Sequence, residues 1–147
     1  MRFTISPTPI DPAPARAALE NVRAGAFVTF EGRVRVRNEE RDVGALEYEA
    51  FAPLAEKEGM KILEEARARY AILDAACIHR AGRLLPGDLA IWVAVAAEHR
   101  GPAFEACRYI VDEAKTRVPI WKKEHYVGGS TEWIHSAGGP GAASPGA

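Results

Sequence analysis

The spacing of apolar residues changes along the chain between a period of two, which predicts strands, and a period near 3.6, which predicts helices. The clearest alternation runs over 27–37. One face of that segment is apolar: Val28, Phe30, Val34 and Val36. Apolar residues recur at helical spacing over 53–70, whereas LAIWVAVAA at 89–97 is apolar throughout. Such a continuous run predicts a central strand that is covered on both faces.

Prolines, glycines and the same two periods complete the prediction. Strands are expected at 2–5, 27–37, 43–51, 72–80, 89–97, 120–125 and 131–135, and helices at 13–24, 53–70 and 101–118. A polar stretch after residue 37 predicts a hairpin between the second and third strands, with a long charged loop. The sum is an α+β fold with a mainly antiparallel sheet and three helices in a single domain over 1–136. Residues 137–147, AGGPGAASPGA, offer little to bury, so a disordered Gly/Pro/Ala tail is expected.

Composition narrows the class of protein. The 147 residues are 48% hydrophobic with a formal net charge of -1, which suits one globular domain and argues against a dedicated nucleic-acid binder. No apolar run approaches the ~18 residues of a membrane span, and the N-terminus lacks the apolar core of a signal peptide. We therefore expect a cytoplasmic location and no membrane partner. Cys77 and Cys107 form no CxxC pair, which predicts reduced, partly buried thiols.

Two groups of cations are candidates for anion binding. Arg33, Arg35 and Arg37 share one face of the predicted strand at 27–37, although such a row is more often a solvated face. His99-Arg100 lies where the buried strand meets the next helix. Free N–H groups and the helix dipole favour an anion at such a terminus, and a guanidinium adds a bidentate fork. A plain surface His-Arg pair explains the second group equally well.

A third group lies in KTRVPIWKKE at 115–124. Lys115 shares a helical stripe with apolar residues, so it is expected beside buried surface. Lys122 lies beyond Pro119 in a predicted strand, where Lys122 and Lys123 point to opposite faces. A partly desolvated lysine among other cations loses basicity, which suits acid/base or nucleophilic work. Lysines that complement a helix dipole would explain Lys115 but not Lys122.

Familiar catalytic templates are missing from the sequence. It contains no GxSxG, no P-loop, no GxGxxG after a strand, and no HxH or HxxxH pair, so neither a metal site nor a cofactor is predicted. His79-Arg80 cannot join His99 in one site within a monomer, because hairpin geometry separates the two pairs by roughly 25 Å. Cys107 lies on the apolar side of a helix and is a poor candidate nucleophile. An anion pocket with lysines remains.

Five segments carry a resemblance to a known family. They are GAFVTFEGRVR at 25–35, LEYEAF at 46–51, HRAGRLLPGD at 79–88, EHRGPAFEACRYIVDEAKTRVPIWKKE at 98–124, and the closing Trp133. Over roughly 1–135 the chain resembles the large, catalytic subunits of molybdopterin synthase. The resemblance implies an α/β hammerhead-like fold and a sulfurtransferase of molybdenum cofactor biosynthesis. It also implies a homodimer within a heterotetramer, with a small ubiquitin-like sulfur-carrier subunit at each end.

In that family the small subunit inserts a C-terminal Gly-Gly thiocarboxylate, and two sulfurs pass to cyclic pyranopterin monophosphate to form the dithiolene of molybdopterin. By resemblance the two catalytic lysines are Lys115 and Lys122. The phosphate-binding cations are Arg35, His99 and Arg100, with the His-Arg pair coming from the neighbouring subunit. Further residues expected to line the same pocket are Arg33, Val34, Lys123 and Glu124. A structural role is expected for His79-Arg80.

Two readings compete with a sulfurtransferase: a non-catalytic module that binds phosphate or carboxylate, and an RNA-binding protein, which the lack of aromatic pairs for stacking disfavours. The distribution of charge helps to decide. Residues 33–37 and 100–123 hold nine basic and three acidic residues and carry +6, while the remainder carries -7. A cationic pocket on an acidic body fits a small anionic substrate better than a nucleic acid.

Overall fold

The chain folds into two β-sheets and three helices over residues 1–38 and 41–135, which are the residues that the computed structural model describes. The elements are β1 (Arg2–Ser6), α1 (Pro12–Ala18), β2 (Ala26–Arg33), β3 (Arg37–Asn38), β4 (Arg41–Ala50), α2 (Ala52–Arg69), β5 (Asp74–Arg80), β6 (Gly82–Leu84), β7 (Leu89–Ala97), α3 (Arg100–Arg117), β8 (Ile120–Tyr126) and β9 (Thr131–His135). This confirms the predicted α+β class. The predicted tail at 137–147 lies outside the described residues.

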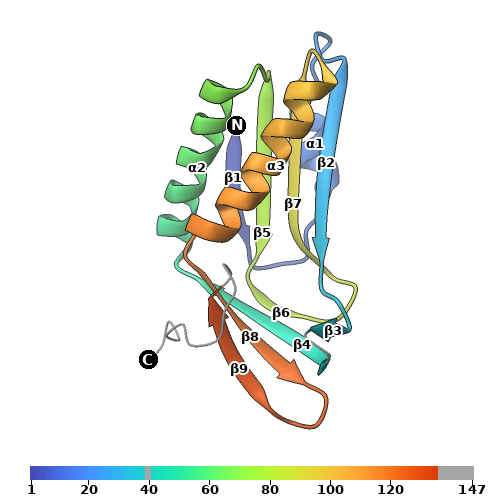
Figure 1. Ribbon diagram of the computed structural model, residues 1–147, viewed down its shortest axis with the longest axis vertical. Coiled ribbons are helices and arrows are strands. Elements are labelled where there is room, and N and C mark those ends of the chain that lie inside the picture. Colours follow the sequence, from blue (N-terminus) through green and yellow to red (C-terminus); the bar gives the residue numbers. More distant parts are fainter. Residues whose placement is uncertain (39–40, 136–147) are drawn as a thin grey trace.

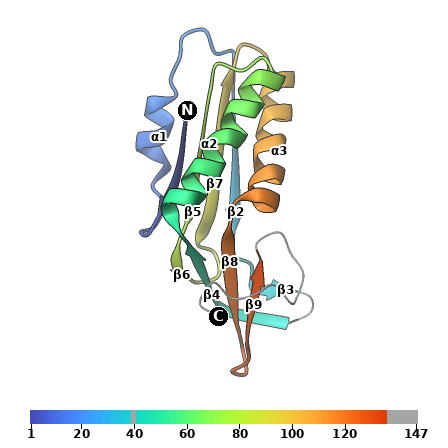
Figure 2. The same cartoon turned by 90° about the vertical axis from the view of Figure 1, so that its left-hand side faces the viewer.

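The first sheet has the strand order β1-β5-β7-β2, in which only β1 and β5 pair in parallel. Helices α2 and α3 cover one face of this sheet, and α1 covers the other (Figures 1 and 2). Residues 90–97 of β7 are buried, as expected of a central strand with helices on both sides. The continuous apolar run in the sequence therefore has its explanation in this three-layer packing.

The main core lies between this sheet and helices α2 and α3. The buried stripe of α2 follows helical spacing: Ala55, Gly59, Ile62, Leu63 and Ala66. At Gly59 the ring of Phe3 packs directly on the helix backbone, because a Cβ there would lie 2.1 Å from the ring's Cγ. This contact holds the edge strand β1 against α2. Cys77 and Cys107 are free thiols buried in the same core, as predicted.

The second sheet has the order β3-β4-β8-β9, and the short strand β6 pairs with β4. In Figure 1 it lies below the first sheet, at the end where α3 finishes and β8 begins. Strand β8 pairs antiparallel with β4, which places Lys122 opposite Tyr48. Because β8 follows α3 after a break at Val118-Pro119, the helix end and this sheet stay close together.

The predicted strand at 27–37 and its hairpin are wrong in part. β2 ends at Arg33, where the pairing with β7 shifts register, and the chain then turns to form only the two-residue strand β3. Val34 is tied to the loop before β7 by a backbone bond from its N–H to the carbonyl of Asp88. A glycine next to such a bulge lets a strand change direction. Consequently β2 and β4 belong to different sheets.

Two other elements differ from the prediction. The helix expected at 13–24 ends at Ala18, because the Asn21 side chain accepts a bond from the Arg23 N–H and starts a turn instead. Strand β6 lies in a segment predicted as loop.

Among the described residues, no helix is long and apolar enough to cross a membrane.

Candidate active site

Two adjoining pockets lie where the first sheet meets the second. The narrower has a volume of about 150 Å³ and the wider about 250 Å³. Both are lined by Arg33 from the end of β2, Tyr48 from β4, Lys115 from the end of α3, and Lys122 from β8. Four elements that are distant in sequence therefore supply one continuous site.

The wider pocket collects cations. Its lining includes Arg33, Arg35, Arg37, Lys115 and Lys122, against the single carboxylate of Glu124. Arg33 is held by its neighbours: its guanidinium donates to the Glu31 carboxylate at 2.8 Å and to the Gly87 carbonyl at 3.2 Å. The buried Val34 side chain forms part of the floor. Such a pocket suits a phosphate or carboxylate, because converging cations stabilise its negative charge.

Lys115 lies in the last turn of α3 and is exposed. Its Nζ lies 5.9 Å from the centroid of the Phe30 ring, so its stem runs along apolar surface before the ammonium reaches the pockets. Snorkelling of this kind leaves the charged head free to meet a ligand.

Lys122 is more enclosed than Lys115. Its side chain is 23% exposed, and its Nζ lies 3.2 Å from Oε1 of Glu124, which is only 2% exposed. The other carboxylate oxygen of Glu124 accepts a bond from the hydroxyl of Tyr126. The pair Lys122 and Glu124 shares one face of β8 because the two residues are two positions apart. A buried carboxylate therefore fixes the position of the ammonium.

Tyr48 and His79 close the narrower pocket. Their rings meet edge to face, with centroids 5.0 Å apart. Burial, with a smaller contribution from the negative charge of Glu124, raises the pKa of Tyr48 to about 12. Burial, reinforced by the positive charge of Lys115, lowers the pKa of His79 to about 4. Both groups are therefore neutral at pH 7.

Three residues named from the sequence lie away from these pockets. His99 caps the start of α3 and Arg100 begins it, whereas Lys115 lies in its last turn. Because an 18-residue helix is about 27 Å long, one chain cannot bring the His-Arg pair to Lys115. Lys123 lies on the opposite face of β8 from Lys122, with its Nζ 5.4 Å from the centroid of the Trp133 ring. The other six, Arg33, Val34, Arg35, Lys115, Lys122 and Glu124, line the site.

Two residues that are not among the predicted site residues also line the narrower pocket, Tyr48 and His79. The alternation of Tyr48 with Glu47 and Glu49 predicts an inward-facing strand residue, but the sequence carries no signal that Tyr48 belongs to a site. A structural role is expected for both His79 and Arg80, and the two residues differ in their contacts. Arg80 is structural, since its guanidinium donates to the carbonyls of Ala81 and Arg83. His79 lines the narrower pocket.

The depressed pKa of His79 predicts acid sensitivity. The unfolded chain takes up a proton at this residue below pH 6.5, whereas the folded protein does so only near pH 4. Acidification through this range therefore favours unfolding, and lowering the pH from 7 to 4 should remove about 3 kcal/mol of stability through this group. Urea denaturation of the wild type and His79→Gln at several pH values measures it. Parallel stability curves for the two proteins would contradict the assignment.

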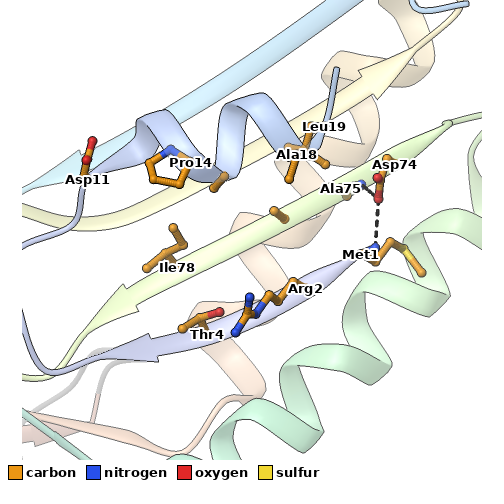
Figure 3. Close-up of a pocket in the computed structure, with 12 residues that line it drawn as sticks. Met1, Arg2, Thr4, Asp11, Pro14, Ala18, Leu19, Asp74, Ala75 and Ile78 are labelled. Carbon is orange, nitrogen blue, oxygen red and sulfur yellow. Dashed lines mark hydrogen bonds and ion pairs between the residues drawn. The ribbon is translucent and has the colours of Figure 1, made fainter. Parts of the chain in front are cut away.

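A larger pocket of about 380 Å³ lies on the other face of the first sheet, between α1 and strands β1 and β5 (Figure 3). Its Asp74 carboxylate is already engaged, with the N-terminal amine of Met1 at 3.0 Å and the N–H of Ala75 at 2.9 Å. This pocket shares no lining residue with the site above.

Within the described ranges, no group of three or more His, Cys, Asp or Glu side chains is placed to hold a metal ion.

Fold and site together define an α+β domain with a cationic pocket, which two lysines from different elements and a buried carboxylate line together. Residues 5–117 match the model of the MoaE protein family. The chain is 46% identical over 110 residues to the molybdopterin synthase catalytic subunit of Thermoplasma volcanium, covering 75% of this chain and 80% of that protein. It is 39% identical over 136 residues to the corresponding subunit of Pseudomonas aeruginosa, covering 91% and 90%.

A solved structure of molybdopterin synthase from Staphylococcus aureus superposes with a TM-score of 0.85 at 34% identity, covering 90% of this chain and 96% of that one. The chain belongs to the MoaE family, whose relatives named above are molybdopterin synthase catalytic subunits.

Proposed function

We propose that this chain is the catalytic subunit of a molybdopterin synthase, which converts cyclic pyranopterin monophosphate to molybdopterin. The two dithiolene sulfurs arrive on the thiocarboxylated Gly-Gly end of a small ubiquitin-like subunit. One observation carries the proposal beyond family membership: Lys115 and Lys122, from different elements, line the same cationic pocket. That pocket offers a place for an anionic substrate, and the adjoining narrower pocket, which the same two lysines line, offers a place for a carboxylate-like tail.

Each side chain has a distinct task in this proposal. Arg33 and Arg35 bind the substrate phosphate in the wider pocket. Lys115, whose ammonium is exposed, holds the thiocarboxylate end and polarises its carbonyl. Lys122, fixed by Glu124, gives and takes protons as sulfur adds and water leaves. Lys123 lies outside the pocket over Trp133, so its proposed contribution is to the surface around the site.

The enzyme needs no nucleophilic cysteine, because the reacting sulfur comes from the partner. Burial of Cys77 raises the pKa of its thiol far above the usual range, and burial raises that of Cys107 to about 11. Neither thiol ionises near neutral pH. Free, buried thiols are typical of a reducing compartment, and we propose that the enzyme works in the cytoplasm.

A second copy of the chain completes the phosphate site in this proposal. His99 and Arg100 lie at the opposite end of α3 from Lys115. An antiparallel arrangement of two copies about a twofold axis would bring the start of α3 in one copy near the end of α3 in the other. The His-Arg pair of each copy would then face the lysines of its neighbour.

Mixed dimers test this arrangement. Arg100→Ala and Lys115→Ala should each lower molybdopterin formation at least about tenfold, because each removes a charged contact to the substrate or the tail. After the two variants exchange subunits at equal concentration, activity should recover to about a quarter of the wild-type value, since half of the dimers then contain one intact site. The measurement is molybdopterin formed from cyclic pyranopterin monophosphate and the thiocarboxylated small subunit.

If each site were built within one chain, mixing the two variants would restore nothing. The same assay separates the enzyme from a non-catalytic module, the alternative that the sequence leaves open. Saturable binding of both the pterin and the thiocarboxylated subunit by the wild type, without any molybdopterin formed, would favour the module.

A further inference from the structure

One residue that lines the narrower pocket, His79, has a ring nitrogen without an assigned task. His79 is 8% exposed and is one of the nine residues that line this pocket. Its Nδ1 lies 2.8 Å from the carbonyl oxygen of Arg80. A carbonyl can only accept, so Nδ1 carries the proton and Nε2 presents a lone pair. Within the described part of the chain, no hydrogen bond reaches Nε2.

The rest of this pocket is rich in donors. Arg33, Lys115 and Lys122 can only donate hydrogen bonds, while the Tyr48 hydroxyl can do either. Such donors suit the oxygen and sulfur atoms of a thiocarboxylate, but they cannot receive an N–H group. Nε2 of His79, through its lone pair, is the side-chain atom of this lining that can act only as an acceptor. A ligand with a negative end and an N–H group behind it would satisfy both kinds of lining.

The shape of the pocket limits the ligand further. Its remaining walls are small or apolar: Gly32, Ala90, Ile91 and Ala114. At Gly32 a Cβ would lie 2.6 Å from the Ile91 side chain, so the wall there is closely packed. A volume of about 150 Å³ is well below the usual size of a pocket for a drug-sized ligand. An extended peptide without side chains fits such a space better than a tricyclic pterin.

We propose that His79 is a positioning residue for the small subunit, whose C-terminal Gly-Gly segment donates a backbone N–H to its Nε2. This inference rests on the function proposed above. The thiocarboxylate end then lies between Lys115 and Lys122. The pterin phosphate occupies the wider pocket, where the tail does not bind. A neutral imidazole is required, because an imidazolium would offer a second donor and repel both lysines.

The shape of the histidine side chain allows a matched pair of variants. In His79→Asn the amide nitrogen can replace Nδ1 and donate to the Arg80 carbonyl, but nothing replaces Nε2. In His79→Gln the amide reaches the position of Nε2 and restores an acceptor. A purely structural histidine, tied only to Arg80, would be replaced at least as well by asparagine as by glutamine.

The experiment measures Kd between the full-length homodimer and the small subunit in two forms, one ending in Gly-Gly and one lacking these two residues. The Kd of the truncated subunit divided by the Kd of the subunit that ends in Gly-Gly reports the contribution of the tail to binding. His79→Asn should lower this ratio about tenfold relative to the wild type, and His79→Gln should recover most of it. Binding of the truncated subunit should be the same for all three proteins, and urea denaturation at pH 7.5 checks that each variant is folded.

An unchanged ratio in His79→Asn would overturn the proposal, as would an equal loss in His79→Gln. A higher KM for the pterin with an unchanged ratio would also overturn it, because His79 would then contact the substrate. These failures are distinct from failure of the proposed function. If the wild type formed molybdopterin at a normal rate and the Kd ratio of His79→Asn equalled that of the wild type, only the proposed role of His79 would be wrong. A wild type that formed no molybdopterin would contradict the proposed function itself.

Discussion

Lys115→Ala is expected to lower the rate of molybdopterin formation at least about a hundredfold, which corresponds to ~3 kcal/mol of transition-state stabilisation. The reason is local: its ammonium lines both pockets and is the exposed cation best placed to polarise the thiocarboxylate. Stability should change little, because exposed side chains away from special contacts contribute within about 0.5 kcal/mol. Single-turnover assays with saturating pterin and thiocarboxylated small subunit measure the rate.

Lys61→Ala is the matched control for this prediction. Lys61 is also an exposed helical lysine, 3.7 Å from Glu58, but it lies on α2 outside both pockets. Its removal should leave the rate and the stability near wild type. A Lys115→Ala enzyme that keeps more than a tenth of the wild-type rate would refute the assignment of Lys115.

Lys122→Ala should show a loss of similar size, at least about a hundredfold in rate, together with a loss of stability. Removing the ammonium takes away the cation that lies 3.2 Å from the nearly inaccessible Glu124 carboxylate, while the hydrogen bond from the Tyr126 hydroxyl remains. Loss of one partner of a buried polar group costs about 1–3 kcal/mol. The rate in the single-turnover assay and the midpoint of urea denaturation measure the two effects separately.

The double variant Lys122→Ala/Glu124→Gln separates chemistry from folding. The neutral amide no longer requires a cation, so the denaturation midpoint should return toward the wild-type value while the rate stays low. Recovery of the rate together with stability would mean that Lys122 acts only by holding the fold, and the catalytic assignment would be wrong.

Local periodicity predicted the elements whose environment is uniform along their length. The stripe of α2, the buried strand β7 and the helix that ends before Pro119 all follow from spacing and from proline sterics. The same reasoning failed where a tertiary contact overrides the pattern. The alternation up to residue 37 continues in the sequence, but bonds from Val34 to the loop before β7 end the strand at Arg33.

The residues that we propose for the chemistry can also be identified from the sequence, because their charges and their spacing are visible there. Lys115 is indicated by the helical stripe that it shares with apolar residues, Lys122 by its position beyond Pro119, and both by a family resemblance. That they line one pocket depends on β8 pairing with β4 and on α3 packing over the first sheet. Neither of those contacts can be predicted from the local spacing of residues.

Pattern, proline and charge thus suffice for the α+β class, most of the element bounds and the cationic character of the site. Tertiary structure alone decided which cations line one pocket, and that a neutral His79 is among the residues of the narrower pocket. The physical reason is the sequence separation between the residues that interact. Helix and strand periods are set by neighbours a few residues apart, whereas the burial of His79 and the support of Lys122 by Glu124 depend on elements brought together only by folding.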